Sequence, residues 1–446
     1  MQPIYPAVEI SDGEHVQLSV PEAAFNPDAL GAIASAHLGA GRLMEAIYCY
    51  EQAMKRKPDD PRILNGLGFA HHQAGREDLA LKCYQLALEI RPDDPGTLCN
   101  LGYLTVEMGF PENARRLFLR ALELDPGNGM AKMNLAISYL TSQEFGRAWP
   151  LVEARFEAKP RIAVPRRYAG MKRWDGGPCR RLALWREPGL GDEVLYSSLL
   201  PSLLDFSALH GFELRLEVST RLLPIIQRSF PEIECVPFDP SGKVFEGCDA
   251  HAPMMDVAKF LRRERFDFFK TQRAAFLKPD AARVESIRHE LRISRPVAAI
   301  SWKSIQKARP FMERKKSAPV SAFNAFDEYF DVVSAQYGLS SDEIESVMMD
   351  APALSILPNL DTMNDLEGVL ALLASVDIVI TTCNVTAHFA GALGKRTLLL
   401  YRAANPPCWY WQPYKSHCLW YPSVEIVTAK EATTWDDVVQ LALQRL

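Results

Sequence analysis

Three segments of the chain repeat one another at a fixed period of 34 residues. Small, aromatic and proline positions recur in register, at Ala46, Ala80 and Ala114; Tyr50, Tyr84 and Phe118; Ala53, Ala87 and Ala121; Pro58, Pro92 and Pro126; and Gly68 and Gly102. A small residue lets two helices approach closely, an aromatic side chain fills the adjoining gap, and proline ends the second helix. This period therefore predicts a stack of helix pairs in which each unit covers the apolar face of the next.

The pattern is similar to the tetratricopeptide repeat, and a fourth, weaker unit keeps Leu135, Tyr139, Ala148 and Pro160 in phase. Such a stack presents a concave face that is typical of peptide and protein binding. We predict that a protein or peptide acceptor contacts four positions of this repeat groove, namely Phe69, Asn100, Tyr103 and Asn134. The alternative is that each is an ordinary repeat residue.

The repeat pattern ends in a segment rich in proline, glycine and basic residues, and short apolar runs then alternate with helical segments. The expected strands are 181–185, 213–218, 297–302, 331–336, 376–381 and 396–401. This alternation predicts two Rossmann-like domains with parallel sheets. We expect an amino-terminal extension (1–26), repeats (27–160), a linker (161–178) and two α/β domains (179–295 and 296–446), with the boundary near Arg295.

One short stretch, Glu187–Asp192, stands where an expected strand ends and an expected helix begins. Ligands of parallel α/β sheets bind at the carboxyl ends of the strands. Gly189 and Gly191 are able to take positive φ and to admit a ligand close to the backbone. Asp192 is then expected at or near the N-cap of the helix.

Four motifs together resemble bacterial glycosyltransferases that carry tetratricopeptide repeats. EPGLGDEVLYSSLLPSLL (187–204) is similar to their E-x-G-x-G-D motif, and residues 361–401 look like their donor-binding element. ISWKS (300–304) resembles the opening of their second domain, and LWYPSVEI (419–426) resembles the closing tail. These enzymes are related to lipopolysaccharide heptosyltransferases. The closest pattern is that of flagellin-modifying enzymes, and the wider comparison includes O-GlcNAc transferases.

The resemblance implies a GT-B fold, in which two Rossmann-like domains follow the helical repeats. It also implies inverting transfer of a sugar from a nucleotide-sugar donor to a protein acceptor such as flagellin. It makes Asp192 the candidate catalytic base, with Glu187 as the alternative carboxylate; otherwise Asp192 only caps its helix. No Asp-x-Asp sequence occurs in the chain, so we expect no metal and no cofactor. Protein cations and helix dipoles would then bind the phosphate of the donor.

Donor-binding residues are expected around the paired glycines, Gly189 and Gly191, and in the second domain. The further candidates are Lys303, Ser304, Gln336, Asn384, Thr386 and His388. The remaining bases of the 302–320 loop, namely Lys307, Arg309, Arg314, Lys315 and Lys316, are expected to be a solvated face. The aromatic run 409–411 either stacks on a base or sugar or closes the two halves. Cys383 stands where the relatives often carry Asp, which bears on the identity of the donor.

Composition excludes several other classes of protein. The net charge of −5 gives no electrostatic case for nucleic-acid binding. No apolar stretch reaches the ~20 residues of a membrane span, and the first residues lack a signal-peptide pattern, so we expect a cytoplasmic protein. Nine cysteines without CxxC spacing are expected to be reduced thiols. Two alternatives stay open: a saccharide or lipid-linked acceptor, and a catalytically degenerate scaffold, for which Cys383 and Pro188 are the departures.

Overall fold

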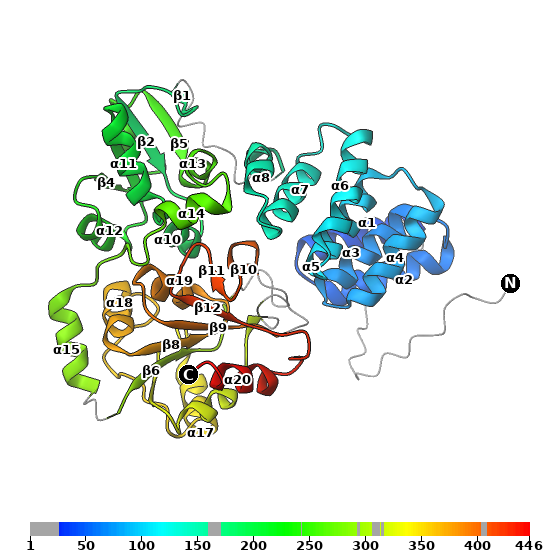
Figure 1. Ribbon diagram of the computed structural model, residues 1–446. Coiled ribbons are helices and arrows are strands. Elements are labelled where there is room, and N and C mark those ends of the chain that lie inside the picture. The colour runs from blue at the N-terminus through cyan, green and yellow to red at the C-terminus, as the bar shows by residue number, and fades with distance from the viewer. Residues whose placement is uncertain are drawn as a thin grey trace. The chain divides into compact units, whose positions relative to one another are not determined.

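The computed structural model describes residues 26–158, 171–241, 243–291, 295–305, 313, 316–402 and 408–446. The predicted architecture is confirmed: helical repeats are followed by two α/β lobes whose sheets are largely parallel (Figure 1). The chain divides into two compact units, residues 1–104 and 105–446, which are described separately. Almost all of the predicted extension and residues 159–170 of the repeat end and linker lie outside the described residues.

Each of the first three repeats is a pair of helices, and each helix is 13 or 14 residues long. The helices are α1 (Pro27–Gly39), α2 (Leu43–Arg56), α3 (Pro61–Gln73), α4 (Glu77–Ile90), α5 (Pro95–Glu107), α6 (Pro111–Leu124), α7 (Gly129–Thr141), α8 (Phe145–Val152) and α9 (Arg155–Ala158). The recurring alanine and aromatic positions are buried, as predicted. A β-carbon on Gly68 would stand 2.8 Å from the Tyr84 ring, so a glycine there lets the aromatic side chain pack.

The turn inside each repeat has a left-handed residue at the same 34-residue step. Gly41, Gly75 and Gly109 have φ of 76°, 77° and 87°, a conformation that glycine adopts without a steric penalty. Gln143 takes this place in the fourth repeat with φ of 58°, and its Nε2 donates to the Gln412 carbonyl at 3.0 Å. The fourth turn thus replaces the usual glycine with a side chain that binds a later part of its own unit.

The first lobe is a five-stranded parallel sheet in the order β1-β5-β2-β3-β4. Its elements are β1 (Lys172–Arg173), β2 (Arg181–Trp185), α10 (Leu190–Ser197), α11 (Leu200–His210), β3 (Glu213–Val218), α12 (Leu223–Ser229), β4 (Glu234–Pro237), η4 (Lys243–Phe245), β5 (Ala250–Pro253), α13 (Met254–Leu261) and α14 (Arg265–Thr271). The predicted linker is corrected at its end, because Lys172–Arg173 pair with β5 as an edge strand.

The second lobe is a seven-stranded sheet in the order β10-β11-β12-β9-β8-β6-β7, parallel from β12 to β7. Its elements are α15 (Ala281–Leu291), β6 (Val297–Ser301), η5 (Val320–Phe326), β7 (Asp331–Ser334), α17 (Ser341–Asp350), α18 (Leu366–Ser375), β8 (Ile378–Thr381), α19 (Val385–Ala392), β9 (Thr397–Leu400), η6 (Trp409–Trp411), β10 (Pro413–Tyr414), β11 (His417–Cys418), β12 (Val424–Val427) and α20 (Trp435–Leu443). Each of the six predicted strands is present within one or two residues of its expected ends.

The boundary between the lobes lies earlier than residue 295. Helix α15 packs against α18 of the second lobe, and Arg283 forms an ion pair with Asp365 there. The backbone N–H groups of Phe276 and Leu277 both donate to the Ala392 carbonyl, at 2.9 and 3.0 Å. The chain therefore changes lobes before α15 rather than after it. The first strand of the second sheet, β6, begins at Val297, so the second lobe starts earlier in the chain than its sheet does.

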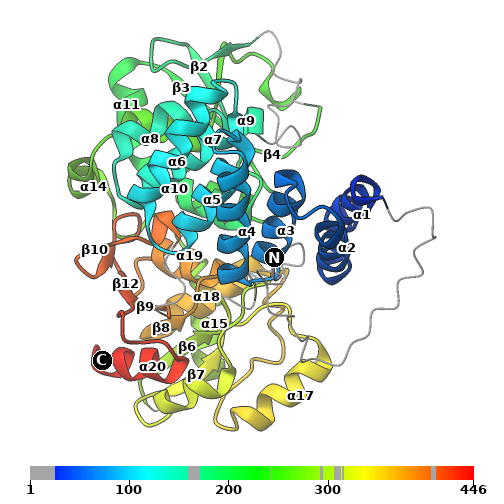
Figure 2. The same cartoon turned by 90° about the vertical axis from the view of Figure 1, so that its right-hand side faces the viewer.

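The lobes and the fourth repeat contact one another within the unit 105–446. Helix α8 packs against α13, and Trp149 Nε1 donates to the Arg262 carbonyl at 2.6 Å. Arg228 of α12 forms a two-bond ion pair with Glu367 of α18, at 2.9 and 2.6 Å. Helix α10 packs against α19 and lies directly above it in both views (Figures 1 and 2). This last contact brings Asp192 of α10 to the second lobe.

Candidate functional site

The paired glycines make room for two side chains at the α10–α19 contact. Neither Gly189 nor Gly191 has a positive φ, so the expectation of a left-handed backbone is wrong. A β-carbon on Gly189 would lie 2.6 Å from Asp192 Oδ2, and one on Gly191 would lie 3.2 Å from His388 Cδ2 and Nε2. Each glycine is therefore needed for close approach of a polar side chain, and one of those side chains comes from the other lobe.

Asp192 is the third residue of α10, because Gly189 and not Asp192 is the N-cap. Its carboxylate is partly exposed and makes no hydrogen bond or ion pair with the residues that the structure describes. Burial, followed by the negative charges of Glu187 and Cys408, raises the pKa of Asp192 to about 6, against the opposing charge of Lys316. A carboxylate with this pKa is suited to accept a proton near neutral pH.

Glu187 is buried, and its Oε1 accepts bonds from the Met255 backbone N–H at 3.0 Å and from Arg155 at 3.4 Å. Burial raises the pKa of Glu187, although Arg155 opposes the shift. Arg155 also pairs with Asp256 at 2.7 Å, so Glu187 joins α9 of the last repeat to α13 of the first lobe. In this geometry Glu187 positions the strand end, and Asp192 is the carboxylate left open.

His388 belongs to α19 and is buried beneath aromatic rings. Its Nδ1 lies 2.9 Å from the Tyr421 hydroxyl, and its ring centre is 4.8 Å from that of Trp411. Burial lowers the pKa of His388 to about 3, with the charge of Lys316 acting in the same direction. The imidazole is therefore neutral at physiological pH. Its Nε2 has no hydrogen-bond partner among the described residues and lies on the Gly191 side of the ring.

The predicted donor residues at the ends of β6, β7 and β8 bond mostly to one another. Gln336 Oε1 accepts from the N–H groups of Trp302 and Lys303 at 2.9 and 2.8 Å, and its Nε2 donates to the Tyr337 carbonyl at 2.9 Å. Asn384 caps α19 by accepting from Thr386 N–H at 3.0 Å. These amides hold three strand ends together. Both polar atoms of the Gln336 side chain are used in these bonds, so the expected direct contact of this side chain with a nucleotide would require breaking one of them.

Small hydroxyls complete this arrangement. Asn384 Nδ2 donates to Ser301 Oγ at 2.8 Å, and buried Thr386 lies 3.4 Å from the Ala335 carbonyl through its Oγ1. Ser304 is also buried, and its N–H donates to Ser317 Oγ at 3.1 Å. The start of α19 is therefore preorganised, with the positive end of the helix directed toward the space between the lobes.

Two lysines of the second lobe have different surroundings. Lys303 Nζ forms an ion pair with Glu343 at 2.6 Å. The positive charge of Lys316 acts to lower the pKa of Asp192, His388 and Cys408, although the pKa of Asp192 is raised overall. Sequence reasoning assigned Lys316 to a solvated face, and nothing in a run of bases could distinguish it. The other bases of that run lie outside the described residues.

A cavity of about 180 Å³ adjoins this site between the lobes. Its lining comes from Leu190 and Arg221 of the first lobe and from Tyr337, Met363, Thr386 and Phe389 of the second. Arg221 Nη1 donates to the Met363 carbonyl at 3.0 Å and so bridges the lobes at the cavity. Arg221 is a second cation that the sequence alone did not single out.

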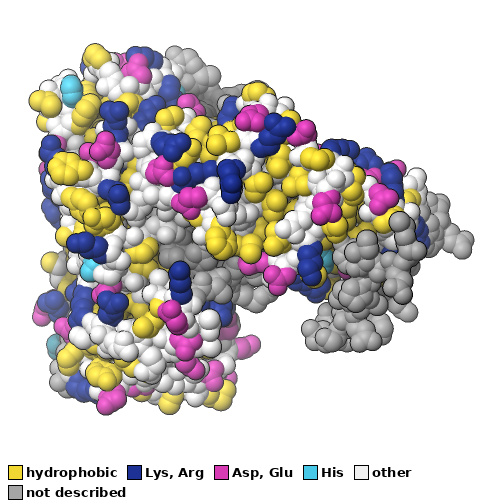
Figure 3. Space-filling view, turned by 45° about the vertical axis from the view of Figure 1, so that its right-hand side comes forward, with side chains coloured by type: hydrophobic (Ala, Val, Ile, Leu, Met, Phe, Trp, Pro, Cys, Tyr) yellow, Lys and Arg dark blue, Asp and Glu magenta, His cyan; other side chains and the backbone are white. Residues whose placement is uncertain are grey.

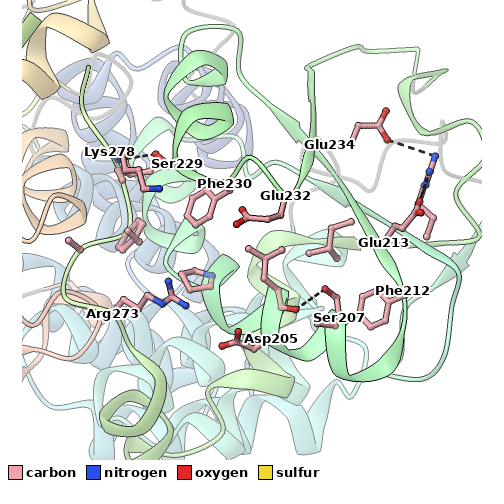
Figure 4. Close-up of a pocket in the computed structure, with 18 residues that line it drawn as sticks. Asp205, Ser207, Phe212, Glu213, Ser229, Phe230, Glu232, Glu234, Arg273 and Lys278 are labelled. Carbon is pink, nitrogen blue, oxygen red and sulfur yellow. Dashed lines mark hydrogen bonds and ion pairs between the residues drawn. The ribbon is translucent and has the colours of Figure 1, made fainter. Parts of the chain in front are cut away.

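A larger hollow of about 940 Å³ lies elsewhere in the first lobe, between α11, β3, α12 and the 273–278 segment (Figure 4). Phe212 and Phe230 form part of its wall, and Glu232 and Arg273 lie at its edge. None of the predicted site residues lines it. The smaller cavity is instead lined by Thr386, one of the predicted donor-binding residues, and by Leu190 at the start of α10.

The aromatic residues 409–411 pack against other aromatic side chains inside the unit 105–446. Trp411 is fully buried, and the ring centres of Trp409 and Trp149 are 6.4 Å apart, edge to face. Trp409 also contacts Trp420 at 5.9 Å. Of the two readings of this run, the packing of Trp409 and Trp411 agrees with hydrophobic closure.

The predicted repeat-groove residues differ in availability. Within residues 1–104, Phe69 is 37% exposed, Tyr103 is half-buried with its ring 5.4 Å from that of His72, and Asn100 Nδ2 donates to Asn65 Oδ1 at 3.0 Å. Asn134, in the other unit, is 7% exposed and has interactions of its own. Phe69 is the most accessible of the four for a bound peptide, and their role in acceptor binding stays a prediction.

On the face drawn in Figure 3, basic and acidic side chains are interspersed and form no field of one sign. Across the residues that the structure describes, no helix has both the length and the apolar character needed to cross a membrane. The same residues contain no group of three or more His, Cys, Asp or Glu side chains placed to hold a metal ion.

Comparisons with known proteins match the repeats and part of the remaining chain. A family model described as tetratricopeptide repeat matches residues 32–95 and 99–160. Protein FlbA of Caulobacter vibrioides (strain ATCC 19089 / CIP 103742 / CB 15) is 30% identical over 317 residues, which are 65% of this chain and 50% of FlbA. The chain thus spans about half the length of this curated relative.

Two solved structures show lower similarity. A mutant of the Thermobaculum terrenum O-GlcNAc transferase is 14% identical, with 96% of this chain and 90% of that chain covered and a TM-score of 0.36. YrrB, described as a tetratricopeptide-repeat protein with an unusual peptide-binding site, is 18% identical over 31% of this chain and 72% of its own, with a TM-score of 0.27. The comparisons thus identify the amino-terminal helices, through residue 160, as tetratricopeptide repeats similar to those of other proteins.

Proposed function

We propose that this chain is a metal-independent inverting glycosyltransferase that moves a sugar from a nucleotide-sugar donor to a hydroxyl group of a protein acceptor held by the repeats. The observation that carries the proposal is the carboxylate of Asp192, which has a pKa near 6 and no partner among the described residues. It lies where the first lobe meets α19 of the second. FlbA is a relative of this chain, with 30% identity over 317 residues. The proposed reaction class comes from the resemblance of the sequence motifs to those of glycosyltransferases.

In the proposed reaction, Asp192 accepts the proton of the acceptor hydroxyl. The hydroxyl oxygen bonds to the anomeric carbon of the sugar, while the bond from that carbon to the donor phosphate breaks with its electron pair. The nucleotide leaves with the added negative charge. Because attack comes from the face opposite the leaving group, the anomeric configuration inverts.

Charge on the departing phosphate needs stabilisation at the moment the bond breaks. The start of α19 offers backbone N–H groups and the positive end of a helix dipole, and Lys316 brings a positive charge to the same region. Neutral His388 is able to donate one hydrogen bond through Nε2 when Nδ1 accepts from Tyr421. These groups support a mechanism without a divalent cation. A donor carrying a nucleoside diphosphate or monophosphate fits this chemistry.

The acceptor is proposed to be a polypeptide because the chain devotes its first helices to tetratricopeptide repeats. The final repeat is also joined to the transferase module through Arg155 and Glu187, and through Trp149 and Arg262. The carboxyl end of the repeats therefore belongs to the same compact unit as Asp192, residues 105–446. Flagellin is the acceptor that the sequence resemblance favours.

The test has two measurements on the full chain. The first is thermal stabilisation by a panel of CDP-, CMP-, GDP-, UDP- and ADP-linked sugars, where a ligand at ~100 times its dissociation constant adds about 2.7 kcal/mol. The second is intact-mass analysis of flagellin and other candidate acceptor proteins after incubation with the donor that stabilises. We expect one nucleotide class to stabilise the protein and a sugar mass to appear on the acceptor.

Matched variants separate catalysis from folding. Asp192→Asn should keep the stabilisation by donor and lose transfer, whereas Asp205→Asn, which removes the same charge from α11, should keep both. Absence of stabilisation by every donor contradicts the transferase and favours a scaffold. Transfer to a saccharide or lipid-linked acceptor, with none to protein, contradicts the protein acceptor alone.

A further inference from the structure

Two cysteines from separate segments meet beside the candidate site. Cys383 follows β8 and precedes α19, and Cys408 precedes η6. Their sulfur atoms are 3.9 Å apart, which is contact distance for two thiols. All nine cysteines are free thiols in the structure, Cys383 and Cys408 included.

The two thiols differ in burial and in charge. Cys383 is 5% exposed, whereas Cys408 is partly exposed. The hydrogen bond from Cys383 lowers the pKa of Cys408 well below its ordinary value, and the positive charge of Lys316 acts in the same direction. The same hydrogen bond, with burial, raises the pKa of Cys383 well above its ordinary value. One thiol is thus accessible and nucleophilic, and the other is protected behind it.

We propose that Cys383 and Cys408 form a reversible dithiol–disulfide pair that reacts with a small-molecule disulfide such as oxidised glutathione. Cys408 reacts first because it is accessible and lies beside Lys316. Cys383 then closes the protein disulfide, which joins the start of α19 to η6. The proposal rests on the contact, the unequal burial and the neighbouring cation, and it does not depend on the transferase reaction.

The exchange is balanced in two steps. The thiolate of Cys408 attacks one sulfur of the small disulfide, whose S–S bond breaks to release one thiolate. Cys383 then loses its proton and attacks the Cys408 sulfur, which releases the second thiolate. Two protein thiols are oxidised and the small disulfide is reduced to two thiols. A protein disulfide has a sulfur separation of about 2.0 Å, so the sulfurs must approach by about 2 Å.

The consequence for the site follows from its contacts. The charge of Cys408 raises the pKa of Asp192, and η6 packs on His388 through Trp411. Formation of the disulfide removes that charge and draws η6 toward α19. On the proposed function, the oxidised protein should transfer sugar at least about tenfold more slowly, and a reducing thiol should restore the rate.

The experiment incubates the full reduced chain with oxidised glutathione, blocks free thiols and maps the peptides without reduction. We expect a linked peptide pair that contains Cys383 and Cys408, and its loss on treatment with dithiothreitol. Cys383→Ser should trap glutathione on Cys408, and Cys408→Ser should give neither product. Cys235→Ser, which removes another partly exposed thiol, should leave the linkage intact.

Two outcomes overturn the proposal: modification of Cys408 no faster than of Cys235, or a linkage between other cysteines. Melting temperatures of the variants within a few degrees of that of the parent chain exclude misfolding as the cause. A linked pair with no change in donor stabilisation or transfer leaves the modification intact and overturns its effect on the site. Failure of every donor to bind, with the disulfide still formed, contradicts the proposed function and not this pair.

Discussion

The imidazole of His388 occupies the space that a side chain on Gly191 would need, since a β-carbon there would lie 3.2 Å from both Cδ2 and Nε2. The two residues belong to different lobes, and they set how closely α10 approaches α19. Asp192 is the next residue after Gly191, so the same contact determines where its carboxylate stands. The glycine pair therefore serves an interface rather than a turn.

Gly191→Ala should separate the helices by a few tenths of an ångström and move the candidate base away from the donor. We expect transfer to fall at least about tenfold, equivalent to about 1.4 kcal/mol of transition-state stabilisation, while the melting temperature changes little. The measurement is kcat/KM beside thermal unfolding. Gly31→Ala, at a position with nothing within 4 Å, is the control and should leave the rate unchanged. An unaltered rate in Gly191→Ala would argue against the interface as the determinant.

The pH dependence of transfer should follow the pKa of Asp192, which is about 6. Because the proposed mechanism uses the deprotonated carboxylate as the base, kcat/KM should rise with pH through about 6 and level off above 7. A profile of kcat/KM between pH 4.5 and 8 checks this. A flat profile over that range would show that another group takes the proton.

The same pKa predicts an effect on stability with a definite sign. A carboxyl group whose pKa is raised by folding stabilises the protein at low pH, and this contribution is lost as the pH rises from the unfolded pKa through about 6. At pH 8 the free energy of unfolding of Asp192→Asn should therefore be about 1 to 2 kcal/mol higher than that of the parent chain, with allowance for the partial exposure of Asp192. The difference should vanish near pH 4. Denaturant unfolding at both pH values measures it, and a destabilised variant at pH 8 would be inconsistent with a burial-raised pKa.

The two lysines of the 302–320 segment should differ in their effect. On the proposed mechanism, Lys316→Ala should lower transfer by about 10²-fold, since it removes a positive charge that acts on Asp192. Lys303→Ala should lower it less, because Lys303 is paired with Glu343. Kinetics of both variants at saturating donor decide between them. A larger loss in Lys303→Ala would restore the prediction made from the sequence and displace Lys316.

Removal of divalent cations should leave the reaction unchanged. The donor phosphate is proposed to be neutralised by protein groups, so a chelator such as EDTA should alter kcat/KM by less than about twofold. The assay compares chelated protein with protein given Mg²⁺ or Mn²⁺. Loss of activity that either ion restores would contradict the metal-free mechanism.

Gly68→Ala tests the packing rule of the repeats. A β-carbon there would lie 2.8 Å from the ring of Tyr84, which is fully buried and has no room to retreat. Overpacking of this kind costs about 1–3 kcal/mol, so the melting temperature of the repeats should fall. Calorimetry of the full chain measures the change. Gly39→Ala, with no atom within 4 Å, should not lower it.

The repeats and most of the parallel strands were predictable because their signals are local. A 34-residue recurrence of alanine, aromatic residue and proline reports how adjacent helices pack, and short apolar runs such as 181–185 report buried strands. The parallel strands that were missed are β1, β4 and β5 in the first sheet and β12 in the second. The first of them lies in a segment whose bases and glycine resemble a linker.

The sequence by itself determined that a carboxylate follows two glycines at a strand-to-helix junction and that basic residues follow β6. Only the tertiary structure decided which of these groups remain available. Glu187 is bonded to Arg155 and Met255, Gln336 to the backbone after β6, and Lys303 to Glu343, whereas the Asp192 carboxylate has no partner among the described residues. The reason is physical: pairing and burial depend on partners about 30 to 70 residues away or more, and local spacing does not record them.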